Sequence, residues 1–93
     1  MKIAAVCGTG LGSSFMIEMN IKKALAELGV TGIELSHYDL ANTTNDLADV
    51  FVMGRDIAPA ASHLKHVIAL NSIIDKKELK EKMETLCKEK HLL

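Results

Sequence analysis

The chain has 93 residues, of which 48% are apolar and only 3% aromatic, and its formal net charge is −1. This length predicts a single small domain over residues 1–93 with an aliphatic core, and the balanced charge excludes the basic footprint of a nucleic-acid-binding protein. Since the chain has neither a run of roughly 20 apolar residues nor a signal peptide, we expect a cytosolic protein.

Short apolar runs and helical stripes alternate along the first half of the chain. Residues 3–6 form an apolar run that predicts a buried strand. Apolar positions then recur every three or four residues from 17 to 28, which predicts a helix that Gly29 ends. Residues 32–37 alternate apolar and polar side chains, as is typical of an edge strand. The first half therefore predicts a strand, a helix and a second strand.

The middle of the chain continues this alternation. Residues 42–46 predict a loop or a short helical turn, and residues 50–53 predict a third, buried strand. A short helix is expected from Asp56, as its N-cap, to about residue 64, because Pro59 falls within the first turn, where proline is tolerated.

The last two elements are a strand and a helix. Residues 66–70 predict the fourth strand. Asp75 then has the place of a helix N-cap, and Glu78 stands at the capping-box position three residues later. The apolar stripe of this last helix consists of Leu79, Met83, Leu86 and Cys87.

Alternation of strands and helices predicts right-handed crossovers and a parallel sheet that is covered on both faces. We therefore expect an α/β fold with three layers, α/β/α, doubly wound around a four-stranded parallel sheet in the order 2-1-3-4. In such sheets, ligands bind at the carboxyl ends of the strands near the point where the strand order reverses. The segment after residue 6 lies at that point.

This segment joins the first strand to the first helix and predicts a phosphate site. Cys7 opens it, and the residues that follow are Gly8, Thr9, Gly10, Leu11, Gly12, Ser13 and Ser14. The first N–H groups of a helix attract an anion, the glycines let backbone N–H groups converge on it, and the serines add hydroxyl donors. A thiol in such a field has an increased thiolate fraction, so Cys7 is the candidate nucleophile.

Three families of phosphate-binding loop compete for this motif, and Ser13 argues against each. A Walker loop needs a lysine at this position, and the dinucleotide fingerprint, counted from Gly8, needs its third glycine there. The loop of small cysteine phosphatases runs from the cysteine through five residues to an arginine, whose place Ser13 also takes. Without that bidentate clamp, backbone N–H groups and hydroxyls stabilise the phosphoryl group, which favours carrying it over hydrolysing it.

The loop Cys-Gly-x-Gly-x-Gly-Ser-Ser, its position near the start and the chain length resemble the IIB component of the bacterial sugar phosphotransferase system. The loop is most similar to the ascorbate-type branch, and the galactitol-type and lactose-type branches are more distant. The resemblance implies a phosphotransferase in which Cys7 accepts a phosphoryl group from a phosphohistidine of a IIA protein. It would pass the group to a sugar, such as ascorbate or a pentitol, that is held by the membrane component IIC.

The resemblance also implies partners and a location. The partners are the IIA donor, the IIC transporter and the sugar, with no nucleic acid, and the protein works in the cytoplasm, recruited through IIC to the inner face of the membrane. Nothing in the sequence requires Mg²⁺ or another cofactor.

Several side chains near the carboxyl edge of the predicted sheet are further candidates. Arg55 directly follows the third strand and would reach the phosphate or an acidic partner; the alternative is a solvated loop arginine. His37 and His63 carry groups that act as acid or base near neutral pH, and a surface histidine is the alternative for each. Asp56 would oppose a phosphate dianion if it pointed inward, so we assign it the capping role.

Three large apolar residues, Phe15, Met16 and Met19, lie off the main stripe of the first helix, close to the loop. An exposed apolar rim there would dock IIA and IIC; alternatively these side chains pack under the neighbouring crossover. Cys87 lies on the apolar stripe of the last helix and is assigned to the core, whereas for Cys7 a buried structural thiol is the alternative.

Two rival functions stay open beside the phosphoryl carrier. A phosphatase-like enzyme of low molecular mass would share the fold and the nucleophile, but it needs the loop arginine and an aspartic general acid. A non-catalytic regulatory module would bind phosphate without transferring it.

Overall fold

The structure is a computed structural model that describes residues 1–8 and 12–93. In this part of the chain, four parallel strands form one sheet in the order β2-β1-β3-β4. The strands are β1 (Lys2–Cys7), β2 (Glu34–Asp39), β3 (Val50–Gly54) and β4 (Val67–Leu70), and the helices are α1 (Gly12–Leu28) and α2 (Lys76–Glu89). The predicted α/β class, the parallel sheet and the strand order are confirmed.

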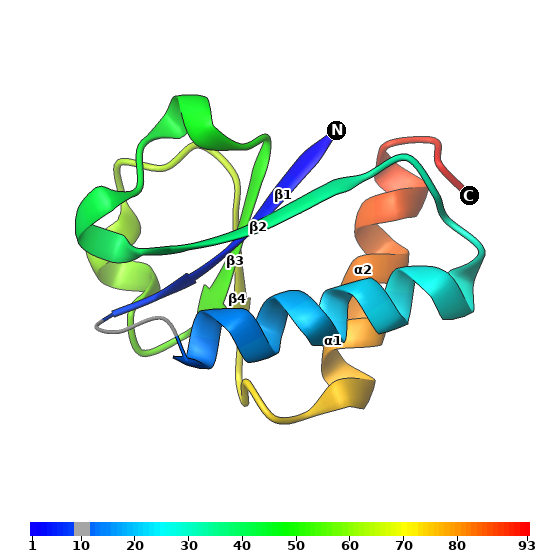
Figure 1. Ribbon diagram of the computed structural model, residues 1–93, viewed down its shortest axis with the longest axis horizontal. Helices are drawn as coiled ribbons and strands as arrows, with labels where there is room; N and C mark the ends of the chain where they lie inside the picture. The colour runs from blue at the N-terminus through cyan, green and yellow to red at the C-terminus, as the bar shows by residue number, and fades with distance from the viewer. Residues whose placement is uncertain (9–11) are drawn as a thin grey trace.

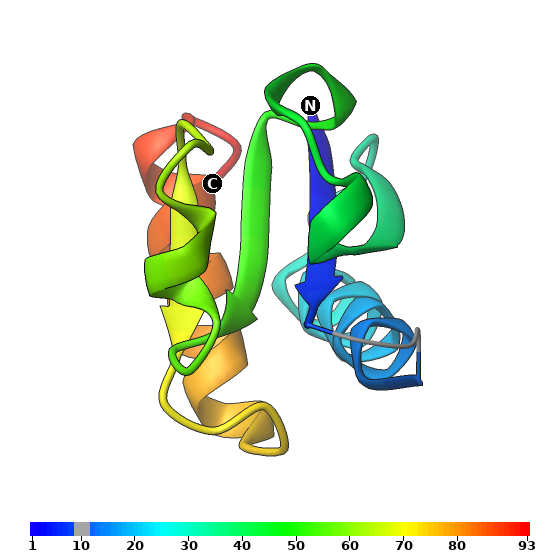
Figure 2. The ribbon, with the colours of Figure 1, turned by 90° about the vertical axis from the view of Figure 1, so that its left-hand side faces the viewer.

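The two faces of the sheet are covered by different kinds of structure (Figure 1). α1 and α2 pack against each other and share one apolar cluster with the sheet. Short 3-10 turns contribute to the cluster on the opposite face, which Figure 2 shows toward the viewer. The turns η1 (Leu40–Asn42) and η3 (Ala58–Ala61) supply residues of this cluster, and a third turn, η2 (Asn45–Leu47), lies between them in the chain. Of the predicted α/β/α layers, the sheet and one helical layer are present, and among the described residues the other face is covered by turns and carries no α-helix.

β1 shows why its sequence is apolar throughout. Successive side chains of a strand point to opposite faces, and here Ile3 and Ala5 belong to the cluster under the helices, whereas Ala4 and Val6 belong to the cluster under the turns. All four are fully buried. β1 therefore lies in the middle of the molecule and ends at the carboxyl edge of the sheet.

The helix expected from Asp56 to about residue 64 is wrong. Only the four-residue turn η3 forms, with Ile57 as its N-cap residue and no side-chain capping bond. Contacts with η2 hold the chain after it: Asn45 Nδ2 donates to the carbonyl of His63 at 2.6 Å, and the N–H of Lys65 donates to Asn45 Oδ1 at 2.7 Å. These long-range bonds replace the helical ones.

Of the capping box predicted at the start of α2, the N-cap Asp75 is confirmed and the return bond from Glu78 is not formed. Asp75 Oδ1 accepts the N–H groups of Lys77 and Glu78 at 3.0 and 3.1 Å, as an N-cap does. Glu78 differs from the prediction because its carboxylate accepts the N–H groups of Asn71 and Ser72 at 2.8 and 3.0 Å. It thus fastens the loop between β4 and α2.

The end of α1 is confirmed, and the second strand is displaced. α1 ends at Leu28, and Gly29 follows with a φ of 75°, a left-handed conformation that glycine adopts without strain. β2 begins two residues later than expected and extends to Asp39, where the sheet register pairs it with Cys7.

Candidate active site at Cys7

Cys7 ends the central strand at the edge of the sheet where ligands gather. β1 is flanked by β2 and β3. The chain runs from β1 to β2 on one side of the sheet and from β3 to β4 on the other, so the strand order reverses between β1 and β3. The residue is 5% exposed. The buried, continuous pairing of β1 therefore fixes the position of the Cys7 thiol.

The thiol lies against the beginning of α1. Cys7 Sγ donates a hydrogen bond to Ser14 Oγ at 3.4 Å, and Ser14 is fully buried in the first turn of the helix. A hydroxyl both donates and accepts, so the same Ser14 group can turn its proton toward sulfur when Cys7 is a thiolate. The first turn of α1 contains no acidic residue to cancel the positive end of its dipole. Cys7 therefore faces a hydroxyl and the N-terminal turn of a helix.

A depression of about 350 Å³ opens beside the thiol. Its lining comes from the ends of β1 and β3, the beginning of α1, and the loops after β3 and β4: Val6, Cys7, Gly8, Ser13, Ile17, Gly54, Asp56, Ile57 and Ile73. A larger hollow of about 640 Å³ lies between β4 and α2. We assign the site to the smaller depression, because it contains the nucleophile.

The residues assigned to the loop from the sequence fall into three groups. Ser13 lines the depression, Ser14 contacts the thiol, and Gly12 begins α1. Gly8 lines the depression directly after Cys7. The remaining predicted loop residues, Thr9, Gly10 and Leu11, lie outside the described residues.

Asp56 lies at the depression, and the capping role assigned to it from the sequence is wrong. An added Cβ at Gly54 would come within 2.5 Å of Asp56 Oδ1, which shows that the carboxylate folds back over the end of β3. β3 neighbours β1 in the sheet, so the segment that follows β3 begins at the same edge of the sheet as Cys7. The sequence predicts Asp56 near this edge, and the cap is preferred there because an inward carboxylate would oppose a phosphate dianion.

Arg55, His37 and His63 lie outside the lining of the depression. Arg55 is exposed, and its backbone N–H donates to the carbonyl of Leu70 at 2.8 Å. Nδ1 of His37 lies 3.1 Å from a carboxylate oxygen of Glu18, and Nε2 of His63 lies 3.1 Å from the carbonyl oxygen of Thr43. Both imidazoles thus contact groups away from Cys7.

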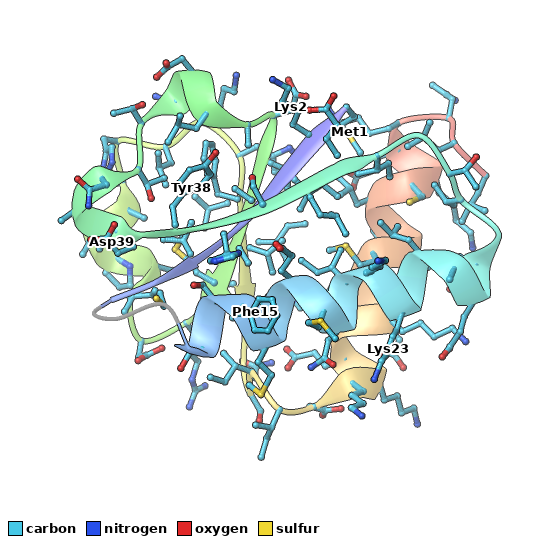
Figure 3. All side chains as sticks on the ribbon, in the orientation of Figure 1. Met1, Lys2, Phe15, Lys23, Tyr38 and Asp39 are labelled. Atoms are coloured by element: carbon cyan, nitrogen blue, oxygen red, sulfur yellow. The ribbon has the colours of Figure 1, made fainter. Side chains whose placement is uncertain are left out.

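The apolar residues near the start of α1 are partly exposed. Phe15 and Met19 are 52% and 44% exposed, and Met16 is half-buried. Figure 3 shows the Phe15 ring on the outer side of α1. The ring meets that of His37 edge-on, with 5.5 Å between the ring centres. An apolar surface therefore lies on the helix whose first turn contacts Cys7.

The fold is similar to that of a solved bacterial phosphatase. A low molecular weight protein tyrosine phosphatase from Bacillus subtilis superposes with a TM-score of 0.53 over 92% of this chain and 91% of that one, at 15% identity. At this identity the likeness concerns the fold alone. The chain is thus a small Rossmann-like α/β protein with a cysteine at the carboxyl edge of its sheet. A search of curated protein sequences finds no match.

Residues 2–85 match the family described as "PTS system, Lactose/Cellobiose specific IIB subunit". The match covers most of the chain, which therefore belongs to this family of phosphotransferase-system IIB proteins. Members act as phosphoryl carriers in sugar transport, with IIA and IIC proteins as partners. Among the described residues, neither helix has the length and apolar character that crossing a membrane requires.

Proposed function

We propose that the chain carries a phosphoryl group on Cys7 between a IIA phosphohistidine and a sugar bound by IIC. The observation that carries this proposal is the position of Cys7, at the end of a central strand and in hydrogen-bond contact with the first turn of α1, in a chain of the IIB family. The N–H groups of that turn and the hydroxyls of Ser13 and Ser14 would stabilise the transferring group.

The proposed transfer has two displacements. In the first, the S–P bond forms while the N–P bond of the phosphohistidine breaks. The electron pair of the N–P bond stays on the imidazole nitrogen, and that nitrogen takes up the proton that the thiol loses. In the second, a sugar hydroxyl attacks phosphorus and the electron pair of the S–P bond returns to sulfur. The thiolate takes up the proton that the sugar hydroxyl loses. Cys7 is therefore regenerated as a thiol after each cycle.

The sugar is proposed to be ascorbate, a pentitol or a similar compound. The cysteine–glycine–serine loop supports this finer proposal through its likeness to the ascorbate-type branch, whereas the description of the matched family names lactose and cellobiose. An assay distinguishes the two possibilities: membranes that contain the cognate IIC are supplied with each sugar in turn, and the phosphorylated product is identified.

The surface of Phe15, Met16 and Met19 is proposed as the docking site for IIA and IIC. Its exposure and its place on the helix next to Cys7 support this role. Flexible methionine side chains suit a surface that two different partners use in turn.

We further propose that the protein works in the cytoplasm, at the inner face of the membrane beside IIC, and that Arg55 assists phosphate or partner binding.

The test is stable phosphorylation of the protein by phosphoenolpyruvate, the general phosphotransferase proteins and IIA proteins of the lactose/cellobiose type and of the ascorbate type, each supplied in turn. Intact-mass and peptide analysis should locate one phosphoryl group on Cys7. Cys7→Ser should lose the label, and Cys87→Ser is the matched control that keeps it.

Two results would contradict the carrier. Rapid release of inorganic phosphate from an aryl phosphate, lost in Cys7→Ser, would indicate a phosphatase. Binding of phosphate without any label on Cys7 would indicate a regulatory module.

A further inference from the structure

The depression beside Cys7 contains a carboxylate. Among the described residues that line it, Cys7 and Asp56 are the ones with titratable side chains, and the other lining residues are apolar, glycine or serine. The Asp56 carboxylate reaches back over Gly54, toward the end of β3 that flanks β1. An anionic side chain therefore stands beside the nucleophile.

Structural roles do not account for this carboxylate. Asp56 caps no helix, and within residues 1–8 and 12–93 its side chain makes neither a hydrogen bond nor an ion pair. Asp56 is also exposed, so it contributes little to the core.

Among the described residues, no positively charged side chain lines the depression together with the Asp56 carboxylate. Arg55 is next to it in the chain but does not line the depression. Asp39, opposite Cys7 on β2, has its carboxylate engaged by Asn42 Nδ2 at 2.6 Å. The attraction for an anion comes from the beginning of α1, and Asp56 acts against it.

We propose that Asp56 is a functional residue of the transfer site, whose carboxylate opposes the phosphoryl group on Cys7 and so keeps the phosphocysteine ready to pass that group on. This inference rests on the proposed carrier function. A phosphoryl group on sulfur carries up to two negative charges, and two anionic groups in one depression resist being fully ionised together. When the S–P bond breaks and its electron pair returns to sulfur, the phosphoryl group leaves and the repulsion ends.

The test compares the phosphorylated wild-type protein with Asp56→Asn, which keeps the shape of the side chain and removes its charge. Phosphorus NMR follows the pH at which the phosphoryl group loses its second proton. Quantitative mass spectrometry measures how phosphoryl groups distribute between IIA and this chain at equilibrium. The variant should lose that proton at a pH lower by about one unit, and the equilibrium should shift about tenfold toward phosphorylated Cys7.

Glu84→Gln is the matched control, since it makes the same charge change at an exposed position on α2 that is absent from the lining. It should leave both readouts at the wild-type values, and thermal melting should show that both variants fold. Phosphorylated Cys7 with an unchanged titration and equilibrium in Asp56→Asn would overturn the role of Asp56 alone. Absence of label on wild-type Cys7 would overturn the carrier function and this inference together.

Discussion

The two cysteines of the chain have similar burial and different surroundings. Cys7 is 5% exposed and Cys87 is fully buried. Cys7 ends a strand, contacts the hydroxyl of Ser14 and opens into a depression. Cys87 lies on the inner face of α2, in the apolar cluster between the helices and the sheet, and burial raises the pKa of its thiol. Burial alone therefore does not distinguish the two thiols; the polar groups around them do.

The apolar side chains near each cysteine differ in the same way. Met83 precedes Cys87 by one helical turn and is fully buried, whereas Met19, on the helix whose first turn contacts Cys7, is 44% exposed. Near Cys87 the apolar residues hold the fold together. Near Cys7 they leave a surface that a partner can cover.

The same substitution at these two methionines should give opposite results. Met83→Asp buries an unpaired carboxylate and should cost on the order of 4 kcal/mol or more, enough to unfold much of a small domain. Met19→Asp should change the free energy of unfolding by about 0.5–1 kcal/mol, because the side chain is on the surface of a helix. Urea denaturation followed by circular dichroism measures both.

Met19→Asp should nevertheless slow phosphorylation by the IIA protein about tenfold, as loss of a central apolar contact in an interface does. Lys23→Asp provides a control on the exposed surface of the same helix. A wild-type rate in Met19→Asp would remove this residue from the docking surface, and a stable Met83→Asp would show that α2 is packed less tightly than described.

Much of this difference is predictable from the sequence. The stripe that contains Met83 and Cys87 follows from helical periodicity, and the strand that ends at Cys7 follows from a continuous apolar run, since both patterns depend on burial alone. The parallel direction of the strands follows from the alternation of strands and helices with short connections. These features specify the position of the Cys7 thiol.

Local patterns failed where long-range contacts decide the structure. Residues 56–64 have the N-cap and proline positions of a helix, but bonds from Asn45 hold the chain after η3 in another course. Without that helix, Asp56 has no cap to form, and it lines the depression beside Cys7. Glu78 likewise fits a capping box, yet it bonds to the loop that precedes α2.

The reactivities of the two thiols should differ by about a hundredfold or more toward iodoacetamide at mildly alkaline pH. Cys7 opens into a depression, whereas Cys87 requires opening of α2 and has a raised pKa, so less of it is thiolate. Peptide mapping after timed alkylation measures both rates in one sample. In denaturant the two rates should become similar, and equal rates in the folded protein would contradict the contrast between the two sites.

The loop between β4 and α2 connects the two sites, because it supplies Ile73 to the depression and leads into the helix that carries Cys87. Two backbone N–H groups of this loop donate to Glu78 and hold the pKa of its carboxyl below the ordinary value of 4.5. A carboxyl with a lowered folded-state pKa stabilises the fold at pH values above its unfolded-state pKa. This contribution disappears as the pH falls through the folded-state pKa.

Glu78→Gln should therefore lower the urea midpoint at pH 7, and the difference from the wild type should shrink as the pH falls below about 4.5 toward the folded-state pKa of Glu78. Glu81→Gln, a neighbour on α2 with an exposed side chain, should show little of this pH dependence. The alkylation rate of Cys87 at pH 7 should rise modestly in Glu78→Gln, because the start of α2 is held less firmly. A midpoint difference that persists unchanged in acid would mean that the side-chain amide disturbs packing and that the charge of Glu78 is not what fastens the loop.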